Sequence, residues 1–456
     1  MSNLSNIGNS VYEFDFSLTR VISDTEYKFI PISKGMILYL EIEDNLSKFG
    51  CQGRVIFNNF YSVLDKLGLG AGINQGVTLF DINFKNLDFD DKVSIVDKAF
   101  QIVTQLGTGD DDSKNPVDKN LTYEFEEYVV RLLREQKVKP DTVTSSKVTD
   151  IIQGLLSTGI DKIKKGEGVY VDPSNFQDSP VIIPIEHIIK PNQSFYDLIS
   201  ICYKYLWYPD NNSPGLLQLE NFKIDDTKIQ RKFTMHPLFT DIKEFHEKIL
   251  TNDKDLKKYV IEQFTIGGES DSVTVRENTI EEYNVCEADL ATLLKTTWVN
   301  HRATYLNNGN ITDTTVNTIK YNDLRELFKK AVLNNKQTPN VPEDKSVNEN
   351  SEVAVDIITN DYVCDFREDA TSPIVIEAGI KAMVTRSFIF DNSAITFKTI
   401  GNPYRKPGMF ILLNENKPDE NQSPFGYWFV ISVKHIFEND IYHNQITAVK
   451  FCVTDK

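Results

Sequence analysis

Apolar and polar residues alternate near both ends of the chain, and this period of two constrains the fold more than any other feature. Side chains two residues apart lie on one face of a β-strand, whereas a helix repeats every 3.6 residues. We therefore expect half-buried strands at both ends. The alternating apolar residues are Tyr12, Phe14 and Phe16 near the start, and Tyr427, Phe429, Ile431 and Val433 near the end.

The middle of the chain has helical spacing instead. We predict helices over residues 123–136 and 147–164, and another around residues 324–332. A further helix begins after Pro191, where Asn192 and Ser194 are candidate caps because their side chains can accept hydrogen bonds from the first turn. The pattern as a whole predicts a β-dominated α+β fold with two small tube-like β-barrel domains at the termini and a mixed α/β middle region.

The 456 residues are too many for one simple core and suggest about three domains. Polar segments without periodicity mark the boundaries. We expect a β domain in residues 1–106, a linker in 107–121, the mixed region in 122–333, a polar linker or long loop in 334–352, and a second β domain in 353–456. Strands from the middle region could complete this last domain, which also contains an alternating segment at residues 387–390.

The charge is strongly negative, with 66 acidic against 49 basic residues and a formal net charge of −17. Such an excess of negative charge argues against a surface that binds nucleic acid by neutralising its phosphates. The sequence contains no uninterrupted apolar run long enough for a spanning helix and no signal pattern at its start, so we expect no stable membrane insertion.

No catalytic or metal-binding motif stands out. The five cysteines are scattered, and His246 begins a zinc-protease motif whose second histidine is replaced by Leu250. The glycine-rich residues 67–76 lack the spacing of a dinucleotide site. His435 and His443 flank a predicted hairpin turn, and we expect them in solvent or at the edge of the core. We predict no catalytic, cofactor-binding or metal-binding residues and no enzyme activity.

Both ends of the chain resemble one family, the central hub proteins of contractile-tailed bacteriophage baseplates, which include the late-control-protein-like hubs. The resemblance rests on the order of short turn and strand motifs. Near the C-terminus these are Ile395–Phe397, Gly401-Asn402-Pro403, Pro407-Gly408 before Met409–Leu413, Gly426–Val430, Val433-Lys434-His435 and Tyr442. Near the N-terminus they are Ile37–Asp44, Gly53–Ile56 and Gly76–Leu79.

The resemblance implies a structural virion protein that is assembled in the host cytoplasm and located in the tail baseplate. Its family forms trimers in which each chain contributes two tube-like barrels, so that three chains match a hexameric tail tube. The implied partners are further copies of the chain, the tail tube protein, the central spike protein and the baseplate wedge proteins. DNA would pass through the lumen during ejection without specific binding, and we expect acidic residues to be concentrated on the channel wall.

Two alternatives remain. One is another baseplate wedge or tube-initiator protein, which would be present in six copies. The other is a carbohydrate-binding β protein that would stack sugars on aromatic residues. Its candidate cluster is Tyr203, Tyr205, Trp207 and Tyr208, although the helical position of these residues favours core packing.

Overall fold

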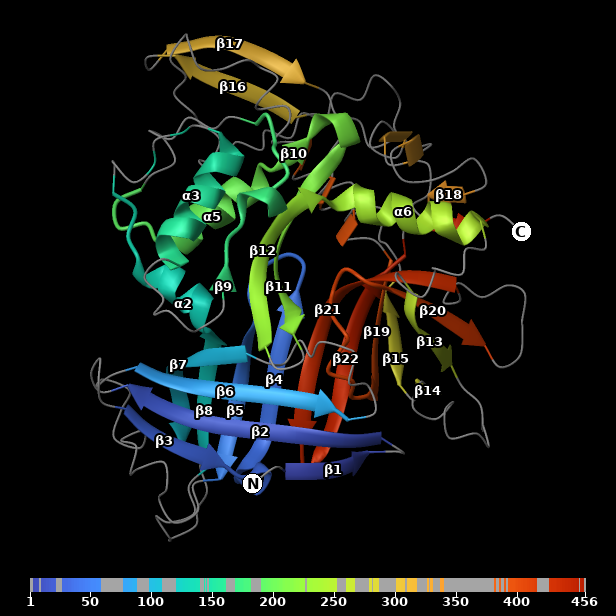
Figure 1. The fold of residues 1–456 in the computed structure, drawn as a ribbon. Helices are drawn as coiled ribbons and strands as arrows, with labels where there is room; N and C mark the ends of the chain where they lie inside the picture. The colour runs from blue at the N-terminus through green and yellow to red at the C-terminus, as the bar shows by residue number, and fades with distance from the viewer. Residues whose placement is uncertain are drawn as a thin grey trace.

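The structure is a computed structural model of the chain (Figure 1). It describes residues 3–7, 10–21, 27–58, 77–87, 98–108, 120–139, 143, 145, 147–160, 169–181, 190–225, 228–251, 260–266, 279–280, 282–286, 301–307, 310–317, 326–327, 329–330, 337–339, 381–382, 385–386, 389–390, 393–415, 426–450 and 452–454.

The N-terminal region forms two crossed layers of strands. Figure 1 shows β2 and β6 running across β4 and β5. The hydrogen-bonded order is β1-β2-β6-β7-β8-β5-β4, and β3 pairs with the second half of β2 on the same edge as β1. The strands are β1 (Asn3–Ile7), β2 (Ser10–Val21), β3 (Tyr27–Ile32), β4 (Ile37–Asn45, after the short 3-10 helix η1, Lys34–Met36), β5 (Gln52–Asn58), β6 (Val77–Asn86), β7 (Lys98–Thr108) and β8 (Asn120–Glu127).

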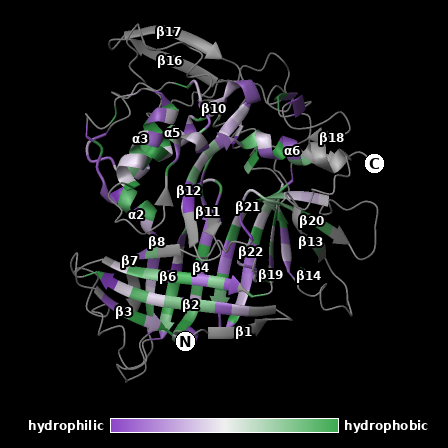
Figure 2. Cartoon of the chain, in the orientation of Figure 1, coloured by the Kyte–Doolittle hydropathy of each residue, from purple (hydrophilic) through white to green (hydrophobic). Residues whose placement is uncertain are grey.

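A core rich in phenylalanine fills the space between these layers, as the green stretches of β2, β4 and β6 in Figure 2 indicate. The predicted alternation is confirmed, since Tyr12, Phe14 and Phe16 are all buried. The rings of Phe14 and Phe84 meet edge to face with centroids 4.9 Å apart, a favourable aromatic geometry. Phe437, from the far end of the chain, belongs to the same core.

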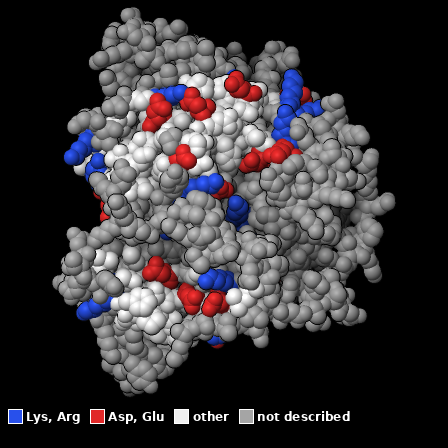
Figure 3. Space-filling model, in the orientation of Figure 1, with Lys and Arg blue, Asp and Glu red and all other residues white. Residues whose placement is uncertain are grey.

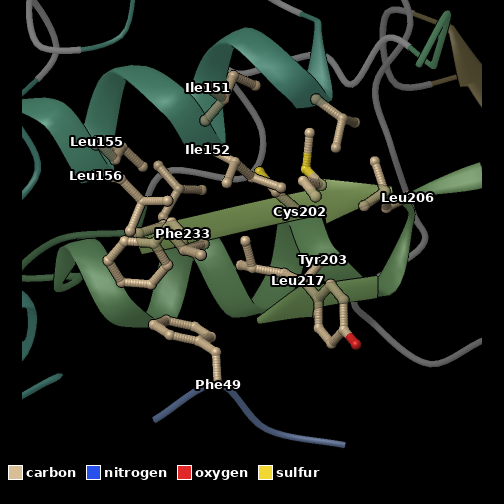
Figure 4. Close-up of a cluster of buried hydrophobic side chains, with 14 of the residues drawn as sticks. Phe49, Ile151, Ile152, Leu155, Leu156, Cys202, Tyr203, Leu206, Leu217 and Phe233 are labelled. Carbon is tan, nitrogen blue, oxygen red and sulfur yellow. The ribbon is translucent and has the colours of Figure 1, made fainter. Parts of the chain in front are cut away.

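The middle region packs helices on a small four-stranded sheet with the order β10-β11-β12-β9. Figure 4 shows α3 and α5 facing β11 and β12, with Phe49 of the β4–β5 turn closing the cluster. The elements are α2 (Tyr128–Glu135), α3 (Val148–Ile160), β9 (Val169–Tyr170), η3 (Pro173–Asn175), α5 (Phe195–Lys204), β10 (Trp207–Tyr208), η4 (Pro209–Asn211), β11 (Ser213–Asp225), β12 (Lys228–Pro237) and α6 (Leu238–Thr251).

The helix predictions are confirmed in part. Helix α3 lies within the predicted 147–164, and α5 begins after Ser194, whose hydroxyl accepts a hydrogen bond from the Asp197 amide at 3.0 Å. The prediction for residues 123–136 is wrong in its first half, because β8 continues to Glu127. Leu121, Tyr123 and Phe125 alternate into the N-terminal core, and that burial imposes strand geometry.

The C-terminal sheet takes strands from two parts of the sequence. β13, β14 and β15 precede the second polar segment, yet β13 pairs with β20 and β15 with β19. The strands are β13 (Val260–Ile266), β14 (Thr279–Ile280), β15 (Tyr283–Cys286), β19 (Ala394–Ile400), β20 (Phe410–Glu415), β21 (Gly426–Glu438) and β22 (Ile441–Val449). Two separate pairs are β16 (His301–Asn307) with β17 (Asn310–Asn317) and β18 (Gln337–Pro339) with β23 (Cys452–Thr454).

Two details of the C-terminal prediction are wrong. Within residues 387–390, Ile389 and Phe390 are helical rather than extended. Ala382, Thr385 and Ile389 are buried at the spacing of a helix face, which explains this conformation. In β21, Val433 lies in the core with Trp428 and Val430, not on the opposite face. A register shift between Val430 and Ser432 inserts one residue and reverses the alternation.

The fold is therefore β-dominated α+β, with one large, largely antiparallel sheet that contains strands from both ends of the chain. Among the residues described, no helix is both long and apolar enough to cross a membrane.

Candidate functional site

The two ends of the chain meet in a continuous sheet. Strand β4 pairs antiparallel with the second half of β21, from Asn45 opposite Ser432 to Tyr39 opposite Glu438. We call this pairing the seam. It joins the sheet of the N-terminal region to the sheet of the C-terminal region through backbone hydrogen bonds, so the two regions share one surface.

The seam lies at the centre of a long antiparallel run of strands. Its order is β7-β8-β5-β4-β21-β22-β19-β15, and every neighbouring pair in it is antiparallel. We call this eight-strand path the wall. Figure 1 places β7 at its left side and β15 at its right side, with the seam between them.

Beside the seam, at β4, the wall has one apolar and one polar face. Leu40 and Ile42 of β4 point into the N-terminal core, whereas Glu41 and Glu43 lie on the opposite face. That polar face is hollowed near the seam into a groove of about 530 Å³. The charged residues that line the groove are Glu41, Glu43, Glu124, Glu126, Arg54 and Lys434.

A hydrogen-bonded cluster links three wall strands across the seam. The Tyr39 hydroxyl donates to Glu41 Oε2 at 2.5 Å, and Lys434 Nζ lies 3.3 Å from Glu41 Oε1. The Arg54 guanidinium lies 5.2 Å from the centre of the Tyr39 ring. Burial and the bond to Glu41 raise the pKa of Tyr39 to about 12. Burial opposes ionisation of Glu41, but Tyr39 and Lys434 outweigh it and lower the pKa of that carboxyl.

Beneath the seam lies a buried polar network that sequence reasoning missed. His435 is only 1% exposed, which contradicts the expectation that it lies in solvent or at the core edge. Its Nδ1 is 2.7 Å from the Tyr442 hydroxyl and 3.0 Å from Asn444 Nδ2. Burial raises the pKa of Tyr442 well above its usual value. His443, by contrast, is partly exposed, and burial followed by Lys398 lowers its pKa.

The same network explains the Gly401-Asn402-Pro403 motif. The Asn402 amide and Arg405 Nη1 both donate to Asn444 Oδ1, at 2.7 and 3.0 Å. The Tyr12 hydroxyl donates to the Gly401 carbonyl at 2.9 Å, so the turn also holds the N-terminal sheet. A Cβ on Gly401 would lie 2.3 Å from the Tyr442 ring. The motif thus stabilises the junction of the two sheets.

A buried ion pair joins the N-terminal sheet to the middle region. Arg231 Nη1 of β12 lies 2.8 Å from Glu127 Oε1, and the other oxygen of Glu127 accepts a hydrogen bond from the Cys51 amide at 3.0 Å. The Glu127 side chain is 0% exposed and that of Arg231 10%. A buried carboxylate needs such partners, because desolvation of an unpaired charge is costly.

The residues considered as binding candidates do not form a second site. Tyr203, Trp207 and Tyr208 are buried in the core of the middle region, so they offer no ring for sugar stacking, and Tyr205 packs partly buried against the same core. The expected helical position is wrong except for Tyr203, because α5 ends at Lys204 and Trp207 and Tyr208 form strand β10. Across the described residues, no group of three or more His, Cys, Asp and Glu side chains is arranged to hold a metal. The glycine-rich residues 67–76 lie outside the described residues, as does the side chain of His246.

No family model and no curated protein matches the chain. The solved structures that are similar to the chain include phage tail proteins. They include the tail protein from Neisseria meningitidis MC58 (9% identity, 95% of this chain and 96% of that chain, TM-score 0.48) and the 43 kDa tail protein of prophage MuSo2 from Shewanella oneidensis (10%, 96% and 98%, 0.45). A chain of the Francisella PdpA–VgrG complex is also similar (12%, 98% and 59%, 0.45).

All three similarities have at most 12% identity and TM-scores below 0.5.

Proposed function

We propose that the chain is a structural subunit of a phage-type tail baseplate, namely the central hub that joins the tail tube to the central spike and forms part of the DNA channel. One observation carries this proposal: the two ends of the chain are hydrogen-bonded into a single wall with a polar face. A channel needs a continuous surface that water wets on one side and a packed core supports on the other.

The proposal includes a division into two tube-like β units. Residues 1–106 form the first with β8, and residues 353–456 form the second with β13, β14 and β15. The mixed region 122–333 is inserted between them, with 107–121 and 334–352 as connections. Two such units per chain would let three chains match a sixfold tube.

The length of the wall favours three copies. Eight strands at ~4.8 Å spacing span ~38 Å. Three copies in a closed ring would have a sheet diameter of ~37 Å and, after ~5 Å for the inner side-chain layer on each side, a lumen of ~27 Å, more if the strands tilt. Duplex DNA, ~20 Å across, would fit. Two copies would give a lumen only ~14 Å wide, and six copies would give a lumen ~63 Å wide.

The charge of the groove suits a channel for DNA. Its four carboxylates exceed its two basic side chains, so the groove repels phosphate on balance. The wider surface is more mixed, because acidic and basic side chains are interspersed on the face shown in Figure 3. The groove, with four acidic and two basic side chains, therefore accounts for only part of the net charge of −17.

The two ends of the wall differ, which suits two different partners. In Figure 1 the helices of the middle region lie beyond one end of the wall strands, while the β21–β22 turn points to the other. We propose that one end meets the tail tube protein and the other the central spike, with wedge proteins around the outside.

The test is the copy number and symmetry of the purified protein. Light scattering gives the mass, and electron microscopy of the protein alone and with its spike gives the rotational symmetry. We expect rings of three chains with a lumen wide enough for duplex DNA. A persistent monomer in both samples would refute the proposal, and a sixfold ring would favour the wedge or tube-initiator alternative instead.

A further inference from the structure

The buried network beneath the seam determines which nitrogen of His435 carries a proton. Asn444 Oδ1 accepts hydrogen bonds from the Asn402 amide and from Arg405 Nη1, at 2.7 and 3.0 Å. Two donors on this oxygen fix the orientation of the side-chain amide, so the atom of Asn444 that lies 3.0 Å from His435 Nδ1 belongs to its NH2 group. Because an NH2 group only donates, Nδ1 accepts, and the proton of the neutral imidazole is on Nε2.

The same imidazole helps to hold the two sheets together. With Nδ1 as the acceptor, the Tyr442 hydroxyl donates to it over 2.7 Å, and both side chains are buried. The Tyr442 ring meets the Tyr12 ring of β2 edge to face, with centroids 6.0 Å apart. The Tyr12 hydroxyl also donates to the Gly401 carbonyl at 2.9 Å. The position of the Tyr442 ring between β2 and the turn at Gly401 therefore depends on an unprotonated Nδ1.

A proton on Nδ1 conflicts with this arrangement. It would face the NH2 group of Asn444, which does not accept, and the Tyr442 hydroxyl would have to turn its own proton away from the ring. His435 is also buried, so an imidazolium there would lose its hydration.

The groups around the network do not compensate for that charge. The charged or titratable groups that the described residues place around Tyr442 and Asn444 are Arg405 and Tyr404 of the turn, Tyr12 of β2, and Tyr442 itself on β22. On the side of β4, the residue opposite His435 is the apolar Ile42. Arg405 is itself a cation, and tyrosines are neutral at neutral and acid pH, so none of these groups neutralises an imidazolium.

We infer that His435 is a pH-sensitive switch at the junction of the two sheets: neutral, it holds the Tyr442 ring against β2 and the turn at Gly401, and protonated, it opens this contact. The inference does not depend on the proposed function. An imidazole exposed in the open form takes up a proton near pH 6.5, whereas the closed form excludes it, so the contact is fully stable above that pH and is lost as the pH falls below it. Exclusion of the proton from the closed form makes the ratio of open to closed molecules about tenfold higher at pH 5.5 than at pH 7.5.

Hydrogen–deuterium exchange of the full-length protein measures this opening. The Gly401 and Asn402 amides report on it, because they donate to the Tyr442 carbonyl and to Asn444 Oδ1. After correction for the intrinsic effect of pH on exchange, we expect the protection of these amides to be about tenfold lower at pH 5.5 than at pH 7.5. Equal protection of the native protein at the two pH values would overturn the inference.

Two variants separate the switch from other effects of acid. His435→Asn places a carbonyl oxygen near the position of Nδ1 and cannot take up a proton, so the tenfold difference should disappear. Asn444→Asp replaces the NH2 group with a carboxylate oxygen, which accepts from an imidazolium, so protection at pH 5.5 should equal or exceed that at pH 7.5.

His443→Asn is the matched control, because this histidine lies on the same hairpin but is partly exposed. This variant should keep the tenfold difference. A His435→Asn protein that still shows the full difference, or an Asn444→Asp protein that responds like the native one, would overturn the inference. If either variant fails to fold, the exchange of the native protein at the two pH values still decides the outcome.

Discussion

At the scale of single residues, a few small or polar side chains make the junction of the two sheets possible. Gly401 leaves room for the Tyr442 ring, and Asn444 accepts hydrogen bonds from both the Asn402 backbone amide and Arg405. His435 completes the network in a place where the sequence alone suggests solvent. These residues satisfy buried polar groups that would otherwise oppose the packing of one sheet on the other.

Alanine substitution at two glycines should have opposite effects on stability. Gly401→Ala places a methyl group against the buried Tyr442 ring, so we expect a loss of about 1–3 kcal/mol in the free energy of unfolding. Gly154→Ala, in helix α3 with no atom within 4 Å of its Cβ, should gain roughly 0.5–1 kcal/mol. Denaturant titration measures both. An unchanged free energy of unfolding in Gly401→Ala would mean that the turn can move to make room for the methyl group.

At the scale of elements, the seam is the critical pairing, since it joins two strands through both backbone bonds and the cluster of Tyr39, Glu41 and Lys434. Register also matters at this scale. The bulge after Val430 turns Val433 toward the C-terminal core while the rest of β21 goes on to pair with β4. With this one inserted residue, a single long strand takes part in both sheets, although a different set of alternating residues faces the core on each side of the bulge.

The seam should weaken in acid. The pKa of Glu41 is lowered in the folded protein, so its stabilising contribution is complete above the ordinary value of 4.5 and is lost as the pH falls through the lowered folded value. We expect the difference in melting temperature between the native protein and Glu41→Gln to be larger at pH 7 and to shrink below pH 4.5. Glu43→Gln, on the same strand and face, keeps the bond from Tyr39 and should not reproduce this pattern. A difference in melting temperature that does not change with pH would contradict the stabilising role of the ionised Glu41 in the seam.

At the scale of the whole molecule, three regions are held together by long-range contacts. The seam joins the N-terminal and C-terminal sheets, and the pair of Glu127 and Arg231 joins the N-terminal sheet to the middle region. The Tyr203 hydroxyl of α5 adds a hydrogen bond to the Leu46 carbonyl at 3.1 Å. The middle region is therefore fixed to the wall.

Breaking the buried ion pair should be costly. Arg231→Ala leaves the Glu127 carboxylate buried without its guanidinium, and we expect a loss of about 3–5 kcal/mol in the free energy of unfolding. Arg131→Ala removes the exposed pair with Glu135 and should cost less than about 1 kcal/mol. Chemical denaturation of both variants measures the difference, and similar values for the two would show that the buried pair contributes little.

The sequence by itself determined the local structure: the strand period of Tyr12, Phe14 and Phe16, the helix capped by Ser194, and the turn at Gly401 can all be predicted because each depends on near neighbours. Only the tertiary structure decided that β4 pairs with β21, that His435 is buried and that Val433 faces the core. Every strand offers the same backbone donors and acceptors, so its pattern does not specify a partner almost four hundred residues away. The continuous polar wall exists only after that pairing is made.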